Sequence, residues 1–397
     1  MALPNVNISI VSGLGRTAAE DDSVSALVAD AVAIAGHLTL GEPLAVTSLS
    51  ELEALGVTEA WDKTNKVLLW HHASDFYAVA PKGTRLYIMP VTKETAYTAL
   101  LSTSEGLAKK LLDYAKGTVK LLAVASMTET PSTLAASIVA AQKLAEFMRR
   151  RNKPLSILLE GRDFPATYTS AADLHEQTAS RVSVVIAQDA DVAAQDDAYA
   201  SYAAVGLALG TLAERSVNQS LGRVKSGSVP VAVAGISNGK KDGDTDYYDD
   251  DQLGVINDKG YLFLRSFSTR AGYYWNSDFT AAPLTDDASS IRMGRTLDKV
   301  VRIIDSRYTE ELNEDYELDA TTGYLNAAVV KNLQTSLYDA VMQQMSGEIT
   351  DLQVIIDPQQ SLLLSDTLKV SVRVVAHGVV AIIEVELSAV NSIESDD

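Results

Sequence analysis

The sequence VKLLAVAS at residues 119–126 is followed by LAASIVAAQKLAEFMRRR at 134–151 and then by LSILLE at 155–160. The first and third stretches are short apolar runs, which are typical of strands buried on both faces, and the stretch between them is a long helical one. A strand, a helix and a second strand in this order predict a parallel pair of strands crossed by a helix. Another apolar run at 182–188 continues the alternation, so we predict an α/β fold, α+β overall, with helix-covered mixed sheets.

The segments on either side extend this prediction. Residues 43–48 and 85–91 are expected to be strands, and residues 51–55 and 66–80 between them are expected to be helices. Further helices are expected at 95–116, 171–181, 198–216, 297–314 and 326–345, and further strands at 261–268 and 352–356. We therefore divide the chain into an N-terminal arm (1–20), a small β-α-α-β unit (21–95), a central α/β domain (96–240), an acidic loop (241–252) and a C-terminal domain (253–397).

Both ends of the chain have strand patterns. Residues 5–11, NVNISIV, alternate polar and apolar, and no hairpin partner lies next to them. This strand must therefore pair with a distant segment of this chain or of another chain, and Gly13 and Gly15 after it form a flexible joint. At the other end, residues 368–375 and 379–387 alternate on both sides of a turn at His377–Gly378, which predicts a C-terminal β-hairpin.

The composition excludes several classes of function. Lys and Arg total 33 and Asp and Glu total 52, so the formal net charge is −19. This charge argues against binding to nucleic acids or to anionic membranes. The chain has 0 Cys and only 5 His, which removes disulfides and thiolate chemistry and weakens most metal and hydrolase interpretations. The longest weakly polar run, residues 199–213, is too short to span a bilayer, so we expect a soluble protein with no direct membrane insertion.

Three motifs resemble catalytic or metal-binding sites, but the residues around each motif do not match what such a site requires. Gly235-Ile236-Ser237-Asn238-Gly239 has the spelling of a nucleophile elbow, but the acidic stretch after it cannot be a buried helix. Asp242, Asp244 and Asp246 have calcium-loop spacing, although Tyr247 replaces the required Gly. His71 and His72 are adjacent on a helix and cannot share one metal. We expect no enzyme activity, no cofactor and no metal, and keep a soluble α/β hydrolase using Ser237 as an alternative.

A basic cluster stands out in this acidic chain. Arg292, Arg295, Arg302 and Arg307 lie in or near the expected helix 297–314. They either form internal and surface ion pairs or dock onto acidic patches of a neighbouring molecule, which self-assembly of such an acidic chain requires.

The order of these elements resembles the contractile tail sheath proteins of bacteriophages and related injection systems. The resemblance covers most of the chain, as in a divergent, short member, and residues 266–273 depart from the family pattern. The matching segments are GEPLAVTSLSELEALG at 41–56, ASDFY at 73–77 with RLYIMPV at 85–91, AAVGLALG at 203–210, LGVIN at 253–257 with the strand at 260–267, and the helices and strands from 297 to 390.

The resemblance implies a structural subunit that polymerises helically, or as hexameric rings, around an inner tail tube and contracts to drive the tube through a target envelope. It implies an extended N-terminal arm and a C-terminal hairpin that exchange strands between subunits. The residues expected to carry this exchange are Val6, Ile8, Ile10, Gly13, Gly15, Val370, Val372, Val374, Val379, Ile383 and Val385.

The implied partners are further copies of the chain, the inner tube protein, and the baseplate and tail terminator proteins. The implied location is a virion tail or injection-system sheath assembled in the bacterial cytoplasm. Arg292, Arg295, Lys331 and Gln334 are expected to contact the tube or a neighbour, with helix 326–345 nearest the tube. A non-contractile self-assembling shell protein is a further alternative.

Overall fold

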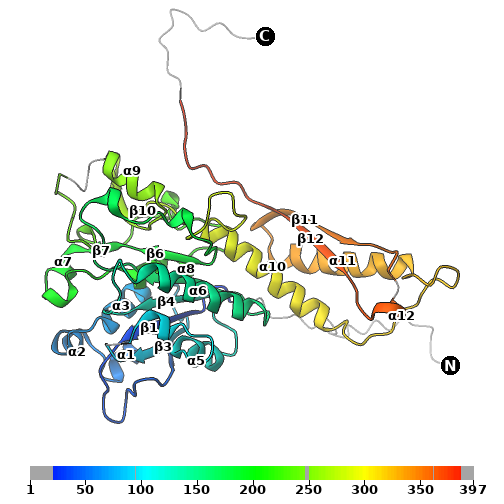
Figure 1. The fold of residues 1–397 in the computed structure, drawn as a ribbon, viewed down its shortest axis with the longest axis horizontal. Coiled ribbons are helices and arrows are strands. Elements are labelled where there is room, and N and C mark those ends of the chain that lie inside the picture. The colour runs from blue at the N-terminus through cyan, green and yellow to red at the C-terminus, as the bar shows by residue number, and fades with distance from the viewer. Residues whose placement is uncertain (1–20, 94, 246–249, 361, 386–397) are drawn as a thin grey trace, which may run out of the picture.

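A computed structural model describes residues 21–93, 95–245, 250–360 and 362–385 of the chain. Its main sheet has six strands in the order β2-β3-β1-β4-β5-β6 (Figure 1). All neighbouring strands run parallel except β2, which is antiparallel to β3. The bounds are β1 Ser25–Asp30, β2 Leu44–Val46, β3 Leu86–Val91, β4 Leu121–Ala125, β5 Ser156–Glu160 and β6 Val182–Val185.

The central strand β1 was not among the expected strands. Its six residues are all buried, and it pairs with β3 on one side and with β4 on the other. Strands from the expected unit 21–95 and from the expected domain 96–240 therefore share one sheet. Because β1 hydrogen-bonds to strands from both segments, the two segments form one main unit around one hydrophobic core.

Helices cover this sheet and connect its strands. α8 contacts β1, β4 and β5 and packs on α3. α5 contacts β3, and α6 contacts β5. The helices of the main unit are α1 Leu49–Ala54, α2 Glu59–Asn65, α3 Leu69–Val79, α4 Tyr97–Leu100, α5 Leu107–Tyr114, α6 Leu134–Arg149, α7 Ala190–Ala193, α8 Val205–Glu214 and α9 Asp250–Asp258, with short 3-10 turns at Tyr168–Ser170, Leu174–Glu176, Asp197–Tyr199 and Val224–Ser226.

Several expected helices differ from the structure: 95–116 is divided into α4 and α5, and in 198–216 the helix α8 starts only at Val205. The stretch 66–80 begins as a left-handed cap at Lys66, and α3 starts only at Leu69, because the carboxylate of Asp62 accepts the backbone N–H groups of Trp70 (3.2 Å) and His71 (2.9 Å). The expected helix 171–181 is wrong. This stretch has only the 3-10 turn Leu174–Glu176, which Asp173 caps by accepting the His175 N–H.

A C-terminal unit extends from the main unit (Figure 1). It contains the second half of α10, then α11, β11, α12 and β12, around the buried residues Ile303, Leu337 and Val341. The remaining elements are β7 Ala187–Asp189 paired with β8 Ala234–Ile236, β9 Leu264–Phe267 paired with β10 Arg270–Trp275, α10 Ile291–Thr309, α11 Ala327–Gln344, β11 Ile349–Ile356, α12 Leu362–Ser365 and β12 Val370–Ala376.

The contact between α3 and α8 depends on two glycines. A Cβ atom at Gly206 would lie 2.2 Å from the carbonyl oxygen of His72, and one at Gly210 would lie 2.6 Å from that of Phe76. The two helices therefore pack backbone to backbone. The small-residue pattern of 203–210 is explained by this close approach.

We predict that Gly206→Ala lowers the free energy of unfolding by about 2 kcal/mol or more, because the forced separation of α3 and α8 outweighs the roughly 1 kcal/mol that alanine adds to helix propensity. Urea unfolding measures the change. Gly254→Ala is the matched control, since this glycine also lies in a helix but a Cβ there meets nothing within 4 Å. The control should be neutral or slightly stabilised, and equal effects in the two variants would contradict the prediction.

Candidate assembly interface

β11 and β12 form an antiparallel two-stranded sheet in the C-terminal unit. One of its faces packs against α10 and α11. The side chains of this inner face are Leu352, Val354 and Ile356 of β11 and Val370, Val372 and Val374 of β12. The residues between them on both strands point to the opposite, more exposed face, as alternation requires.

No other described strand pairs along the outer edges of this sheet. Among the described residues, β11 pairs with β12, and one further bridge joins Ile349, at the start of β11, to Ser346. Unpaired N–H and C=O groups along a strand edge are a template for an added strand. The sheet therefore offers two positions at which an extended segment of another chain can bind.

A groove lies beside β11. Its volume is about 420 Å³. Its walls come from α11 and β11 and none from β12, so it opens along the edge of β11 that faces away from β12. The lining residues are Lys331, Gln334, Thr335, Tyr338, Asp339, Leu352, Gln353 and Val354. Lys331 and Gln334 were expected to be contact residues, and the structure places both on this groove.

The expected hairpin is wrong in its second strand. Residues 370–376 form β12, but their partner is β11, and the described residues 377–385 form no strand. Alternation predicts a strand without identifying its partner, and β11 is the strand that lets Val370, Val372 and Val374 reach the core under α11. The strand expected at 352–356 has the same alternation as β12, with apolar residues at Leu352, Val354 and Ile356. This shared alternation is the sequence feature that could have predicted the pairing.

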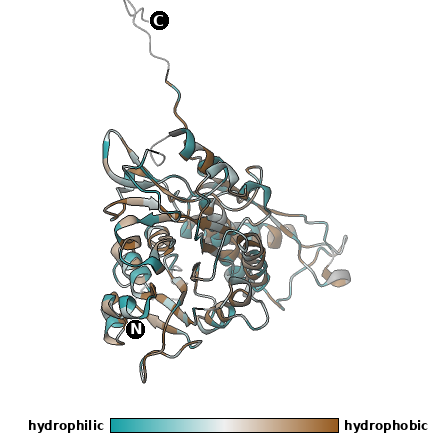
Figure 2. Ribbon diagram, turned by 60° about the vertical axis from the view of Figure 1, so that its left-hand side comes forward, coloured by the Kyte–Doolittle hydropathy of each residue, from teal (hydrophilic) through white to brown (hydrophobic). Residues whose placement is uncertain are grey.

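The segment after β12 is apolar and exposed. Ile382, Ile383 and Val385 are each 79% exposed, and Val380 is 73% exposed. The segment leaves the body without packing on it (Figures 1 and 2). Adjacent residues point to opposite faces of an extended chain, so both faces are apolar here, and isolated surface leucines or valines do not explain such a run. Val379, Ile383 and Val385 thus lie on a tail that the described residues of the subunit leave largely uncovered. The N-terminal strand residues Val6, Ile8, Ile10, Gly13 and Gly15 lie outside the described residues.

Two of the expected contact arginines are occupied inside the subunit. Arg295 is 4% exposed and donates to the backbone oxygens of Asp22 (3.4 Å) and Arg215 (3.2 Å). Arg292 forms an ion pair with the buried Asp278 at 2.7 Å. The expectation that Arg295 contacts a tube or a neighbour is therefore wrong, because α10 is seated against the main unit along this face.

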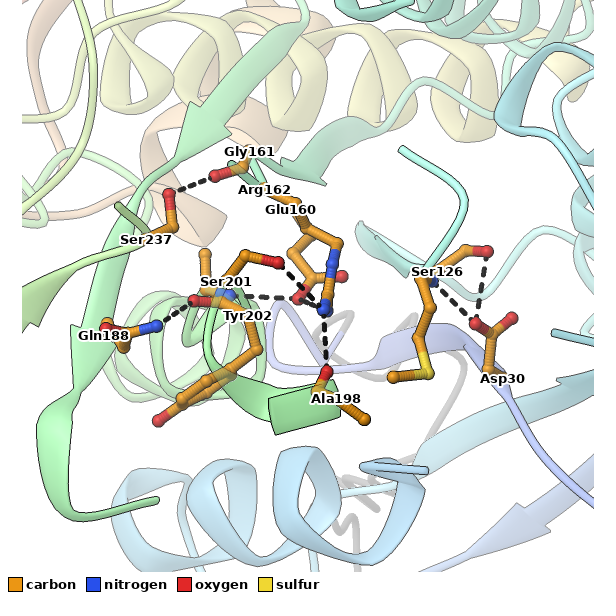
Figure 3. A network of polar contacts seen from close by, with 12 residues as sticks. Asp30, Ser126, Glu160, Gly161, Arg162, Gln188, Ala198, Ser201, Tyr202 and Ser237 are labelled. Atoms are coloured by element: carbon orange, nitrogen blue, oxygen red, sulfur yellow. Dashed lines mark hydrogen bonds and ion pairs between the residues drawn. The ribbon is translucent and has the colours of Figure 1, made fainter. Parts of the chain in front are cut away.

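The carboxyl edge of the main sheet is the place where open α/β folds bind ligands. In Figure 3 the side chains there point at one another. Glu160 accepts from Arg162 (3.0 Å) and from the Ala203 N–H (2.9 Å), and Arg162 also donates to the Ala198 carbonyl (3.1 Å). Burial raises the pKa of Glu160 to about 7. These contacts hold neighbouring loops together.

Ser237 does not have the environment of a nucleophile. Its side chain is fully buried and its hydroxyl donates to the Gly161 carbonyl at 2.6 Å (Figure 3). Asp242 accepts from the hydroxyl of Tyr273, and Asp246 of the same acidic stretch lies outside the described residues. In the described part of the chain, no three His, Asp or Glu side chains are placed as metal ligands, and no described helix is long and apolar enough to cross a membrane.

Comparison with known proteins identifies a family and a fold. The model of the DUF2586 N-terminal domain matches residues 3–278, and the model of the DUF2586 C-terminal domain matches residues 287–394. No curated protein matches the chain in sequence.

Several solved structures are similar to this chain. A chain of the anti-feeding prophage baseplate, solved by cryo-EM with 6-fold symmetry, has a TM-score of 0.62 and 16% identity, covering 98% of this chain and 99% of that one. A chain of the same baseplate in the contracted state has a TM-score of 0.62, 15% identity and coverage of 98% of both chains. The sheath tail protein of Listeria innocua has a TM-score of 0.50 and 12% identity, covering 89% of this chain and 94% of that one. The fold is that of a tail sheath protein, which confirms the predicted fold class and the resemblance.

A buried carboxyl group at the sheet edge predicts a pH dependence. Asp30 is 4% exposed; one oxygen accepts from the Met127 N–H (2.6 Å) and the Ser126 hydroxyl (3.3 Å), and the other has no partner. Burial raises the pKa of Asp30 to about 6. Because the folded state holds this proton more tightly than the unfolded state, the stabilisation is present below about pH 4 and is lost as the pH rises through about 6.

We predict that Asp30→Asn removes this loss. Relative to the native chain, the variant should gain about 2 kcal/mol of unfolding free energy between pH 4.5 and pH 7.5, measured by urea unfolding at both values. Glu105→Gln changes an exposed carboxylate and is the control. A difference between the native chain and Asp30→Asn that stays constant with pH would contradict the assignment.

Proposed function

The chain belongs to the DUF2586 family, and we propose that it is a subunit of a contractile tail sheath that polymerises helically around an inner tube. The machine would be a phage tail or a related injection system. The shared fold with a chain of the anti-feeding prophage baseplate and with a sheath tail protein supports a component of such an assembly. The observation that carries the proposal is an exposed apolar tail in a subunit that also has two free strand edges.

The subunits are joined by strand exchange. Each copy supplies two extended ends, residues 5–11 and 379–385, and each copy offers the free edges of β11 and β12. The N-terminal strand, with Val6, Ile8 and Ile10 on its apolar face, binds in the groove beside β11 of a neighbour. The C-terminal tail binds at the free edge of β12 of another neighbour. Main-chain hydrogen bonds then give the affinity, and the apolar faces extend the core under α11.

This linkage suits a structure that changes shape. Gly13 and Gly15 separate the exchanged strand from the body, so subunits rotate while the strand stays paired. Lys331 and Gln334 line the groove, and we assign them to the incoming strand. The tube protein, the baseplate and the tail terminator are the further partners in this proposal, and assembly takes place in the bacterial cytoplasm before the sheath becomes part of the tail.

We predict that the purified chain forms hollow tubes or stacked rings in negative-stain electron microscopy, alone or after addition of its tube protein. Deleting residues 1–12 should abolish these particles and leave the circular dichroism spectrum and the unfolding midpoint unchanged. Tubes formed equally well by the shortened chain would exclude strand exchange through this arm.

Substitutions within the arm test the same interaction without shortening the chain. Replacing Val6, Ile8 and Ile10 together by Ser should prevent assembly, because it removes the apolar face that the groove buries. Replacing Asn5, Asn7 and Ser9 together by Ala is the matched control and should assemble normally, since these residues alternate to the opposite face. Loss of assembly in both variants, or in neither, would contradict the assigned face.

A further inference from the structure

Lys299 binds two carboxylates, one of which lies close to the first described residue of the chain. The carboxylate of Asp22 accepts from the Lys299 ammonium at 2.6 Å, and Glu348 accepts from the same ammonium at 2.7 Å. The three side chains are only 12–21% exposed. Lys299 lies on α10, Asp22 lies three residues before the central strand β1, and Glu348 directly precedes β11.

A second cation on the same helix secures this arrangement. Arg295, one turn before Lys299, is buried and donates to the backbone oxygens of Asp22 and Arg215. Asp22 is thus held through its side chain by one residue of α10 and through its backbone by another. These contacts fix the position of Asp22 on α10.

The charges of this cluster are mutually dependent. Burial acts to lower the pKa of Lys299, but the hydrogen bonds and charges of Asp22 and Glu348 outweigh it and raise this pKa. The lysine therefore keeps its charge throughout the working pH range. Without it, neither carboxylate would have an ion-pair partner at hydrogen-bond distance in this partly buried cluster, and only the more distant charge of Arg295 would act on both.

We propose that Lys299 is the positioning residue of the strand exchange: it fixes the root of the N-terminal arm and the start of the accepting strand β11 to the same turn of α10. The inference rests on the proposed function and goes beyond it. A pull on the arm by a neighbour then reaches the central strand β1 through the backbone after Asp22, and it reaches the start of β11 through the Lys299 ammonium group. The distance between Asp22 and the start of its own acceptor strand β11 then stays constant while subunits move.

The test uses the full chain with Lys299→Met, which keeps the length of the side chain and removes its charge. Hydrogen exchange followed by mass spectrometry should show at least tenfold faster exchange in peptides covering residues 20–25 and 346–350. Arg181→Met is the matched control, because Arg181 forms another buried ion pair with α10, to Asp298 at 2.9 Å, and touches neither carboxylate. It should leave both peptides at native rates even where it lowers the unfolding midpoint.

Two further variants keep the test decisive if Lys299→Met does not fold. Lys299→Arg retains the charge and several donors and should restore native exchange. Asp22→Asn keeps the Lys299–Glu348 pair and should accelerate exchange only at residues 20–25. Unchanged exchange in Asp22→Asn and Lys299→Met, or equal acceleration in Arg181→Met, overturns the proposal.

Tube formation is a second measurement, and it should not change if Lys299 only stabilises the fold of the subunit. Lys299→Met chains with native helix content should form no tubes, or tubes of a different diameter, while Arg181→Met chains form native ones. Tubes of native diameter from Lys299→Met overturn the positioning role. If the native chain itself forms no tubes with its tube protein, the proposed function fails, while the exchange data still decide whether Lys299 holds the arm root.

Discussion

One face of α10 lies against the main unit along most of the helix, and another face of its second half lies in the core of the smaller unit. Two stripes on one 19-residue helix make this possible. Arg295, Asp298, Arg302 and Asp305 recur at three- and four-residue spacing and bind backbone or side-chain groups of the main unit. Val300, Ile303, Ile304 and Tyr308 recur on another face and pack in the core of the C-terminal unit. The position of the C-terminal hairpin relative to the main sheet depends on this shared helix.

The charged stripe is stable inside the molecule because each charge meets a specific partner. Arg302 donates to the backbone oxygens of Val119 (3.3 Å) and Pro154, at the ends of two segments that lead into β4 and β5. Burial lowers the pKa of Arg295 to about 10, so it stays protonated at neutral pH and keeps its bonds to the backbone. The helix is thereby anchored at the amino-terminal edge of the sheet, opposite the edge that carries the Glu160–Arg162 network.

The C-terminal unit combines open strand edges with an exposed apolar tail. In the main sheet the apolar strands are covered by helices, and its polar groups at the carboxyl edge bind one another. In the hairpin of β11 and β12 two edges stay open within the described chain, and the tail after β12 exposes apolar side chains on both faces. An isolated subunit with these features has a strong tendency to bind other chains through main-chain pairing, which is the physical basis of the proposed assembly role.

Much of the main unit could be predicted because its signals are local. Runs such as 119–126 and 155–160 are too short and too apolar to be anything other than buried strands, and the helix between them is long and periodic. The strand β1 escaped prediction because its six residues follow an acidic stretch and have no alternation. The helix expected at 171–181 has helix-forming residues, but the chain there is held by contacts to distant segments, such as the bond from His175 to the Ala282 carbonyl at 2.8 Å.

The sequence by itself determined the α/β class, the acidic and cysteine-free character, and the strand pattern of residues 370–376, because periodicity and composition are properties of neighbouring residues. Only the tertiary structure decided the partners. β12 pairs with β11 and not with the residues that follow it, because this pairing places the apolar faces of both strands against α10 and α11. Arg295 points inward instead of toward a neighbour, since the carbonyl oxygens that bind it come from segments 80 and 273 residues away. Pairing between distant segments is a property of the packed molecule, and no local pattern specifies it.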